Sequence, residues 1–84
     1  MKAVRMYSTR SCPFCVMARR LLSSKGAQVD EIAVDDRPER REEMTRVTGR
    51  YTVPQIFVGE VHVGGCEDLY ALDRCGRLDP LLKD

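Results

Sequence analysis

Two cysteines separated by two residues are the side chains in this sequence best suited to chemistry. They lie in the run Ser11-Cys12-Pro13-Phe14-Cys15, between a short strand pattern and an amphipathic helix pattern. Pro13 suits the first position of a helix, because its ring fixes φ and its missing N–H would have no partner there. Cys12 would then face unpaired N–H groups and the positive end of the helix dipole, which favour a thiolate. The spacing therefore predicts a redox-active dithiol with Cys12 as its exposed nucleophile.

Cys15 is expected to be the resolving partner of Cys12. Three residues along a helix, its side chain returns to the same face one turn later, where it can close a disulfide and is shielded from solvent. The same pair could be half of a zinc site, but zinc needs a second pair at matching spacing. Cys66 and Cys75 are nine residues apart and do not supply one. We therefore expect a redox pair and no metal site, with Cys75 as a bystander thiol.

Length and composition narrow the class of protein. The chain has 84 residues with 43% hydrophobic residues, which predicts one domain over residues 1–84 and argues against disorder. Fourteen basic and 13 acidic residues give a formal charge of +1, so no overall field favours nucleic acid or a membrane surface. No apolar stretch has the length of a secretion signal or a membrane span. We expect a cytoplasmic protein with reduced thiols, and a monomer is the default.

The pattern of elements predicts a mixed four-stranded sheet with three helices, in the order β-α-β-α-β-β-α. Val4 and Met6 alternate with Arg5 in the strand that leads to the cysteines. Gly59-Glu60 has the form of a type II′ turn between two antiparallel strands, and His62 should point to solvent on the second of them. The expected strands span residues 3–7, 28–34, 55–58 and 61–63. The expected helices run from Pro13 to a stop at Gly26, from a cap at Asp35-Asp36 to about Thr48, and from Cys66 to Arg74.

Three motifs in this order resemble those of the glutaredoxins, and the resemblance covers essentially the whole chain. They are Cys12-Pro13-Phe14-Cys15, Thr52-Val53-Pro54 and Gly64-Gly65-Cys66-Glu67-Asp68. The resemblance implies a thioredoxin-like α/β fold. It also implies a glutathione-dependent dithiol-disulfide oxidoreductase that reduces protein disulfides and glutathione mixed disulfides, with glutathione as reducing co-substrate.

The resemblance further implies where glutathione would bind. Pro54 would be cis opposite the cysteines, so that the backbone of Val53 could pair with glutathione as an added strand. Backbone N–H groups of Gly65 and Cys66 would bind the γ-glutamyl carboxylate, and Asp68 would accept from its ammonium group. The full set of implied binding residues is Phe14, Thr52, Val53, Pro54, Gly65, Cys66 and Asp68.

Two positions depart from the family pattern. Phe14 stands between the cysteines where tyrosine is common, so the apolar wall remains without the phenolic hydroxyl. Thr9 stands where a lysine is usual, and the replacement cation for the glycyl carboxylate could be Arg10, Arg41 or Arg50. The sequence does not rank these three arginines.

Two other functions remain open from the sequence. The chain could be a glutaredoxin-like electron donor that thioredoxin reductase reduces and that serves ribonucleotide reductase. Gly64-Gly65 with Asp68 argues against this, because the donor would lack a glutathione pocket. The chain could also carry an iron–sulfur cluster between two subunits, but the proline after Cys12 and the free Cys15 argue against that. The expected partners are glutathione and glutathionylated or disulfide-containing proteins, with ribonucleotide reductase as one candidate.

Overall fold

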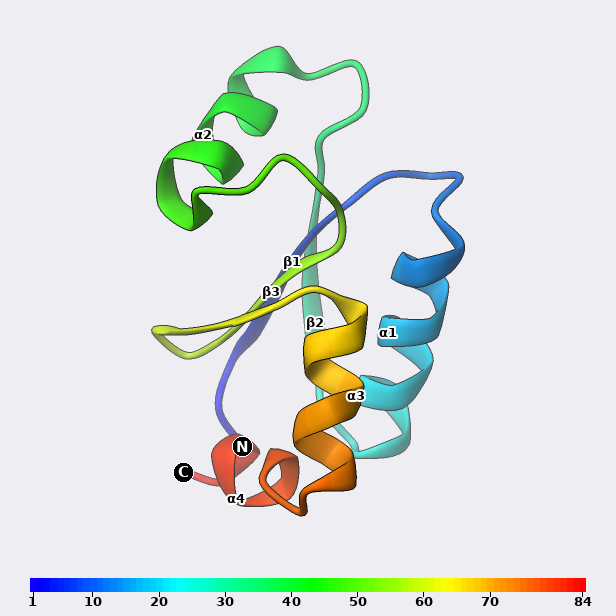
Figure 1. Ribbon diagram of the computed structural model, residues 1–84, viewed down its shortest axis with the longest axis vertical. Coiled ribbons are helices and arrows are strands. Elements are labelled where there is room, and N and C mark those ends of the chain that lie inside the picture. The colour runs from blue at the N-terminus through cyan, green and yellow to red at the C-terminus, as the bar shows by residue number, and fades with distance from the viewer.

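The computed structural model describes residues 1–84 and contains the predicted four-stranded sheet, with strand order β2-β1-β3-β4. β1 pairs with β2 in parallel and with β3 in antiparallel orientation, and β3 and β4 form the hairpin. Figure 1 shows α3 in front of the strands with α1 beside it on the right, and α2 at the top end of the molecule. The strands are β1 (Val4–Ser8), β2 (Val29–Ala33), β3 (Gln55–Val58) and β4 (Val61–Gly64), and the helices are α1 (Pro13–Ser24), α2 (Pro38–Thr48), α3 (Cys66–Arg74) and α4 (Leu78–Leu82).

The fourth helix was absent from the sequence prediction. α4 has five residues, too few for helical periodicity to be recognised in the sequence. Leu78 and Leu82 are nevertheless buried in the core, and the carbonyl of Leu82 accepts a hydrogen bond of 2.8 Å from the Lys2 N–H. The C-terminal helix is therefore hydrogen-bonded to the residues just before β1.

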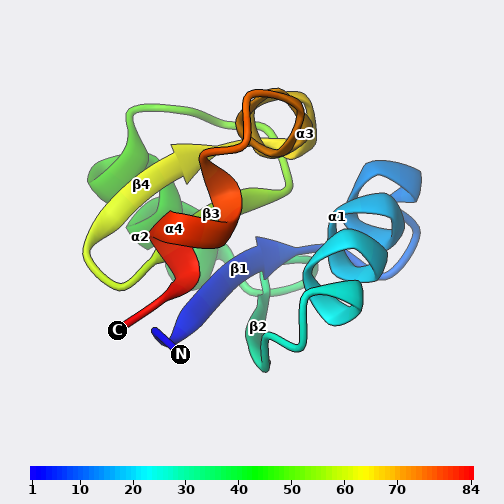
Figure 2. The same cartoon turned by 90° about the horizontal axis from the view of Figure 1, so that it is seen from below.

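One face of the sheet carries the larger core. Ten buried residues form a single cluster that joins the sheet to α1, α3 and α4. Figure 2 shows the backbone of these three helices beside the strands, seen from below. Ala18 and Leu22 contribute from α1, and Leu69 contributes from α3. Val4 and Met6 point to this face from β1, because successive side chains of a strand alternate between faces. This packing fixes α1, and therefore the cysteines at its start.

The opposite face is covered more thinly by α2. Met44 is the only buried residue of that helix, and it packs in a cluster of four with Tyr7, Val34 and Phe57. The hydroxyl of Tyr7 also donates to the carboxylate of Glu43 at 2.5 Å. Burial, assisted by this bond, raises the pKa of Tyr7, so the hydroxyl remains a donor. One methionine and one hydrogen bond are thus the main attachments of α2.

The prediction that Asp35 and Asp36 cap α2 is wrong. The N-cap is Arg37, which makes no side-chain capping bond. Both carboxylates instead bind Arg10, with the Asp36 contact at 2.9 Å and the Asp35 contact at 3.2 Å. Asp36 has φ of 61°, a left-handed conformation that places it in the turn before the helix. Tertiary ion pairs therefore displaced the local cap.

The hairpin turn agrees with the sequence prediction. Gly59 has φ of 57°, whereas Glu60 is not among the residues with positive φ, which fits a type II′ turn and excludes type I′. None of the helices is long and apolar enough to cross a membrane.

Candidate active site

The two cysteines of the predicted dithiol lie at the start of α1 as free thiols. Cys12 is the N-cap, and its sulfur accepts a hydrogen bond of 3.2 Å from the Cys15 N–H. The Cys12 sulfur also lies 3.7 Å from the carbonyl oxygen of Val53, in the segment just before β3. The placement of Cys12 at the helix N-terminus and of Cys15 one turn later is confirmed.

Burial differs between the two thiols. Cys12 is half-buried, whereas Cys15 is fully buried. Burial raises the pKa of the Cys15 thiol to about 12, and its hydrogen bond with Cys12 acts in the same direction. A substrate can therefore reach the first sulfur while the second remains a protonated thiol.

A cleft of about 320 Å³ lies beside Cys12, between the start of α1, the segment before β3 and the start of α3. The Val53–Pro54 peptide bond is cis, as expected, and forms one wall. The structure brings all seven implied binding residues to this cleft and adds one that the sequence did not single out. The lining residues are Phe14, Thr52, Val53, Pro54, Gly65, Cys66, Glu67 and Asp68.

Two hydrogen bonds hold the carboxylate of Asp68, which lines the cleft. Its Oδ2 accepts the Gly65 N–H at 2.9 Å and an Arg50 guanidinium N–H at 3.0 Å. The bond from Gly65, helped by Arg50, lowers the pKa of this carboxyl below its usual value. The Gly65 N–H is therefore occupied by Asp68 and is not free for a ligand carboxylate, which corrects one implied role. Cys66 and Glu67, in the first turn of α3, keep N–H groups without intrahelical partners.

Gly64 explains why a glycine precedes this helix. It has φ of 116°, and a Cβ at this position would lie 2.3 Å from Oδ2 of Asp68. Any side chain here would displace the carboxylate. The first glycine of the Gly64-Gly65 pair thus makes room for Asp68.

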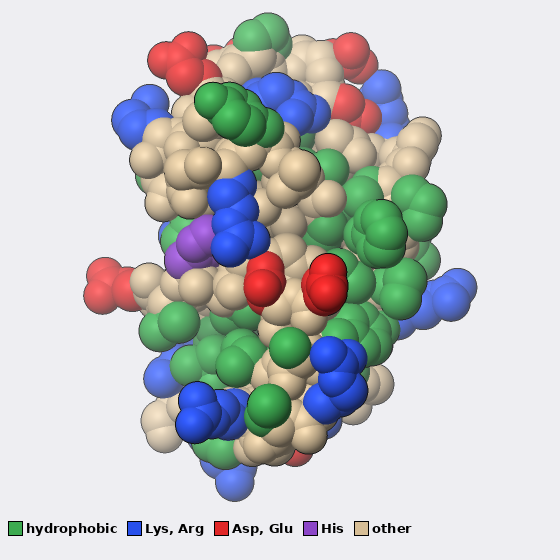
Figure 3. Space-filling model, viewed as in Figure 1, with side chains coloured by type: hydrophobic (Ala, Val, Ile, Leu, Met, Phe, Trp, Pro, Cys, Tyr) green, Lys and Arg blue, Asp and Glu red, His purple; other side chains and the backbone are tan.

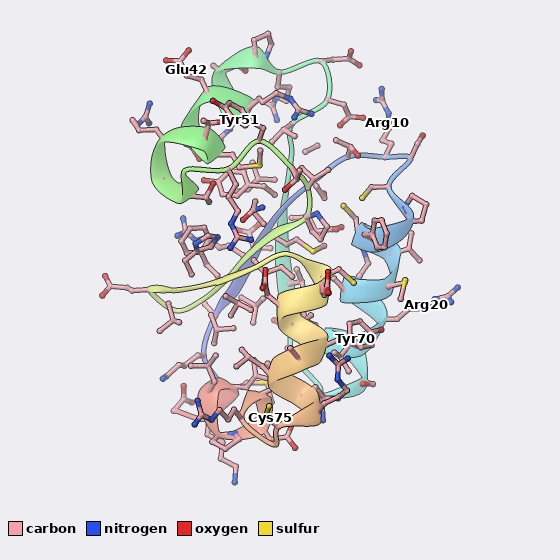
Figure 4. All side chains as sticks on the ribbon, viewed as in Figure 1. Arg10, Arg20, Glu42, Tyr51, Tyr70 and Cys75 are labelled. Atoms are coloured by element: carbon pink, nitrogen blue, oxygen red, sulfur yellow. The ribbon has the colours of Figure 1, made fainter.

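The structure separates the three arginines that the sequence left unranked. Arg50 contacts Asp68 at the cleft. Arg41 donates to the carbonyl of Tyr51 at 3.2 Å, on the approach to the cleft. Arg10 pairs with Asp35 and Asp36 instead, and Figure 4 shows it near the loop that leads into α1, pointing to solvent.

Comparison with known proteins identifies the family. The glutaredoxin family model matches residues 4–63. The chain is 54% identical over 82 residues to a glutaredoxin of Pseudomonas aeruginosa, covering 98% of each. The solution structure of a glutaredoxin from Brucella melitensis aligns with a TM-score of 0.87 at 53% identity, covering 99% of this chain and 90% of that one. The crystal structure of a buckwheat glutaredoxin–glutathione complex aligns with a TM-score of 0.89 at 28% identity, covering 96% and 76%.

The chain belongs to the glutaredoxin family. It is a glutathione-dependent dithiol-disulfide oxidoreductase with a thioredoxin-like fold. Its closely spaced Cys12–Cys15 pair is the redox centre of that family activity.

The other two cysteines of this glutaredoxin occupy different places. Cys66 is buried at the start of α3 and lines the cleft, as the resemblance implied. Burial raises the pKa of its thiol. Cys75 is exposed, and Figure 4 shows it at the far end of α3 from the cleft. A larger hollow of about 770 Å³ includes Cys75. The smaller cleft is lined by Val53, whose carbonyl oxygen lies 3.7 Å from the Cys12 sulfur, so we assign the dithiol chemistry to the smaller cleft.

The expectation that His62 points to solvent is wrong. Its ring packs on Phe57 with centroids 4.9 Å apart, and its Nε2 lies 2.8 Å from Oε1 of Gln55. Gln55 is itself fully buried in β3. Sequence reasoning missed this pair because a strand of alternating Val, His and Val shows only which residues share a face. The one available signal was Gln55 itself, a polar residue at the start of an otherwise apolar strand.

Proposed function

We propose that Cys12 is the nucleophile and Cys15 the resolving thiol of a reaction that reduces glutathione mixed disulfides and protein disulfides. The observation that carries this proposal is the position of the half-buried Cys12 sulfur beside a cleft that ends at Asp68. The fully buried Cys15 lies behind it and cannot meet a bulky substrate first. The residues that line this cleft would then form the glutathione site.

The first step transfers glutathione to the protein. The Cys12 thiolate attacks the glutathione sulfur of a mixed disulfide, the bond between that sulfur and the substrate sulfur breaks, and the substrate leaves as a thiolate that takes a proton from water. The Cys15 N–H, 3.2 Å from the Cys12 sulfur, stabilises the attacking anion. Cys12 then holds glutathione through a new disulfide.

The second step releases the glutathione. The thiolate of a second glutathione attacks the bound glutathione sulfur, which yields oxidised glutathione and restores the Cys12 thiolate. With a protein disulfide, the Cys12 thiolate first bonds to one substrate sulfur and releases the other as a thiolate. Cys15 then loses its proton and attacks the Cys12 sulfur, so that the substrate leaves as a dithiol and a Cys12–Cys15 disulfide forms, which two glutathione molecules reduce. Negative charge on Cys12 is one cause of the raised pKa of Cys15. Formation of the mixed disulfide removes that charge, so Cys15 becomes easier to deprotonate when its attack is required.

Glutathione fits the charges of the cleft in one orientation. Oδ1 of Asp68 accepts no hydrogen bond from the protein and can accept the γ-glutamyl ammonium. The carboxylate beside that ammonium would take the first-turn N–H groups of α3. Val53 would pair with the cysteinyl backbone. Arg41 would supply the cation that Thr9 does not, because Arg50 is already paired with Asp68 at the γ-glutamyl end. The buckwheat relative forms a complex with glutathione, which supports glutathione as the ligand of this cleft.

Protein substrates would dock around the cleft. Phe14, Val16 and Met17 are exposed hydrophobic residues on α1, and Figure 3 shows hydrophobic side chains gathered along this side of the molecule. Tyr51 is 75% exposed on the other side of the cleft. We propose that these residues contact glutathionylated or disulfide-containing proteins.

We also propose that residues 1–84 act as one domain without a resident metal. We place this domain in the cytosol, where the glutathione pool keeps thiols reduced.

Two cysteine variants test the proposal. Cys12→Ser should abolish both deglutathionylation of a small mixed disulfide and reduction of a protein disulfide in a glutathione-coupled assay. Cys15→Ser should retain the first activity and lose the second, because glutathione can replace the resolving thiol only in the first. Equal behaviour of the two variants in both assays would refute the assignment. Reduction of the wild type by thioredoxin reductase but not by glutathione would refute the glutathione site.

A further inference from the structure

A buried amide stands directly behind the wall of the cleft. The side chain of Gln55, at the start of β3, is fully buried. Its Nε2 donates to the carbonyl oxygen of Thr52 at 3.0 Å and to the Thr52 hydroxyl oxygen at 3.2 Å, and its Oε1 lies 2.8 Å from Nε2 of His62. Both ends of the amide are therefore used. An unpaired amide here would be costly, whereas an apolar side chain would need no partners at all.

The direction of each bond follows from the donors. The Thr52 carbonyl can only accept, so the NH₂ group of Gln55 must face Thr52 and Oε1 must face His62. The His62 ring then donates from Nε2. Because the Thr52 hydroxyl accepts from Gln55, its own proton is free to donate elsewhere. Thr52 is exposed and lines the cleft, so this proton is available to a ligand there.

The His62 ring, at the other end of this hydrogen-bond network, is also held in place. The His62 ring packs on Phe57, and the guanidinium of Arg5 lies 5.0 Å from the centre of the Phe57 ring. Burial lowers the pKa of His62, so near neutral pH the ring is uncharged and carries its proton on Nε2. His62 thus holds the amide of Gln55 in one orientation, and Gln55 holds Thr52.

We propose that Gln55 and His62 are positioning residues that fix the hydroxyl and carbonyl of Thr52 for binding of glutathione. The inference rests on the glutathione cleft proposed above. Neither Gln55 nor His62 is among the residues that line the cleft. Their contribution is to keep a hydroxyl proton of Thr52 directed to the cleft and to hold the backbone next to Val53.

The test compares glutathione dependence with dithiol dependence. Gln55→Met should raise the apparent KM for glutathione by about threefold to tenfold, as for the loss of one uncharged hydrogen bond, with kcat and reduction by a small dithiol unchanged. His62→Leu should raise the same KM, whereas His62→Gln, which keeps a donor at a similar distance, should restore it. Val61→Thr, one residue away on the exposed part of β4, is the matched control.

Two measurements make the test decisive even if Gln55→Met folds poorly. Nitrogen-15 NMR should find the neutral His62 ring protonated at Nε2, and the Nδ1–H tautomer would overturn the proposal. In a Thr52→Val background, His62→Leu should raise the KM less than it does in the wild type, because the hydroxyl is gone and only the backbone carbonyl remains to be held. A full additional increase would overturn the inference.

Different results would refute the positioning role and the glutathione cleft on which it rests. An unchanged KM in His62→Leu, together with a raised KM in Asp68→Ala, would refute the positioning role and leave the cleft in place. An unchanged KM in both variants would refute the glutathione cleft itself.

Discussion

One face of the sheet buries a cluster of ten residues, whereas the opposite face buries only four. The first cluster joins three helices to the sheet, and the second depends on Met44 of α2. In Figure 1, α2 lies at one end of the molecule and leads directly into the segment before β3. The two faces therefore attach their helices with very different amounts of buried apolar surface.

The two faces also hold different groups of the active site. The reacting cysteines begin α1, and Asp68 lies in the first turn of α3, so the densely packed face holds the groups whose geometry matters most. Arg41 lies on α2 and Arg50 follows that helix, on the lightly packed side. A protein with this construction can keep its nucleophile fixed while the rim of its cleft adjusts to different substrates.

Truncation of one core residue on each face should give the largest contrast. Leu69→Ala should lower the free energy of unfolding by about 2–5 kcal/mol, because a fully buried leucine leaves a cavity that the packed face cannot fill. Met44→Ala should cost less, because α2 can settle onto the sheet or detach from it. Denaturant unfolding measures both values, and a larger loss for Met44→Ala would contradict the contrast.

Asp68→Ala tests recognition on the packed face. It removes a charge-assisted contact worth about 1.5–3 kcal/mol, so glutathione-dependent efficiency should fall by about tenfold to a hundredfold. Reaction with a small dithiol should hardly change. A thermal melt checks that the helix start survives the loss of the Gly65 bond. Unchanged glutathione efficiency in a variant of normal stability would reduce Asp68 to a helix cap.

Cys15 should make stability depend on alkaline pH. The unfolded thiol loses its proton near 9.0, whereas the folded thiol holds it to about 12. Between these values the unfolded state has released a proton that the folded state retains, so rising pH favours unfolding. Wild-type protein should therefore lose stability above pH 9 more steeply than Cys15→Ala, as measured by denaturant midpoints along a pH series. Parallel curves would show that burial does not shift this thiol.

Arg10→Ala should have the smallest effect. The side chain is largely exposed and its partners are Asp35 and Asp36, so the loss of stability should stay below about 1 kcal/mol. The kcat/KM for glutathione should remain within about twofold of wild type. The reason is that solvent and salt screen the ion pairs of Arg10, and neither Arg10 nor its two partners line the cleft. The same assay on Arg50→Ala should show the larger loss, and the reverse order would move the missing cation to Arg10.

Local sequence signals predicted most of the fold. Pro13 marked the start of α1, Gly59 marked the hairpin, and the alternation of Val4 and Met6 marked the strand beneath the cysteines. These features depend on backbone preferences of a few neighbouring residues, which is why they could be recognised. The helix α4 could not, because its five residues are helical on account of where Leu78 and Leu82 are buried.

The sequence by itself determined the redox pair, its position at a helix start and the motifs that line the cleft. Only the tertiary structure decided that Arg50 binds Asp68, that Arg10 binds Asp35 and Asp36 in place of a helix cap, and that His62 turns inward to Gln55. Each of these contacts joins segments that the chain brings together only after folding. Charge and hydrogen-bonding capacity are properties of single residues, but their partners depend on distance in space, which spacing along the sequence does not fix.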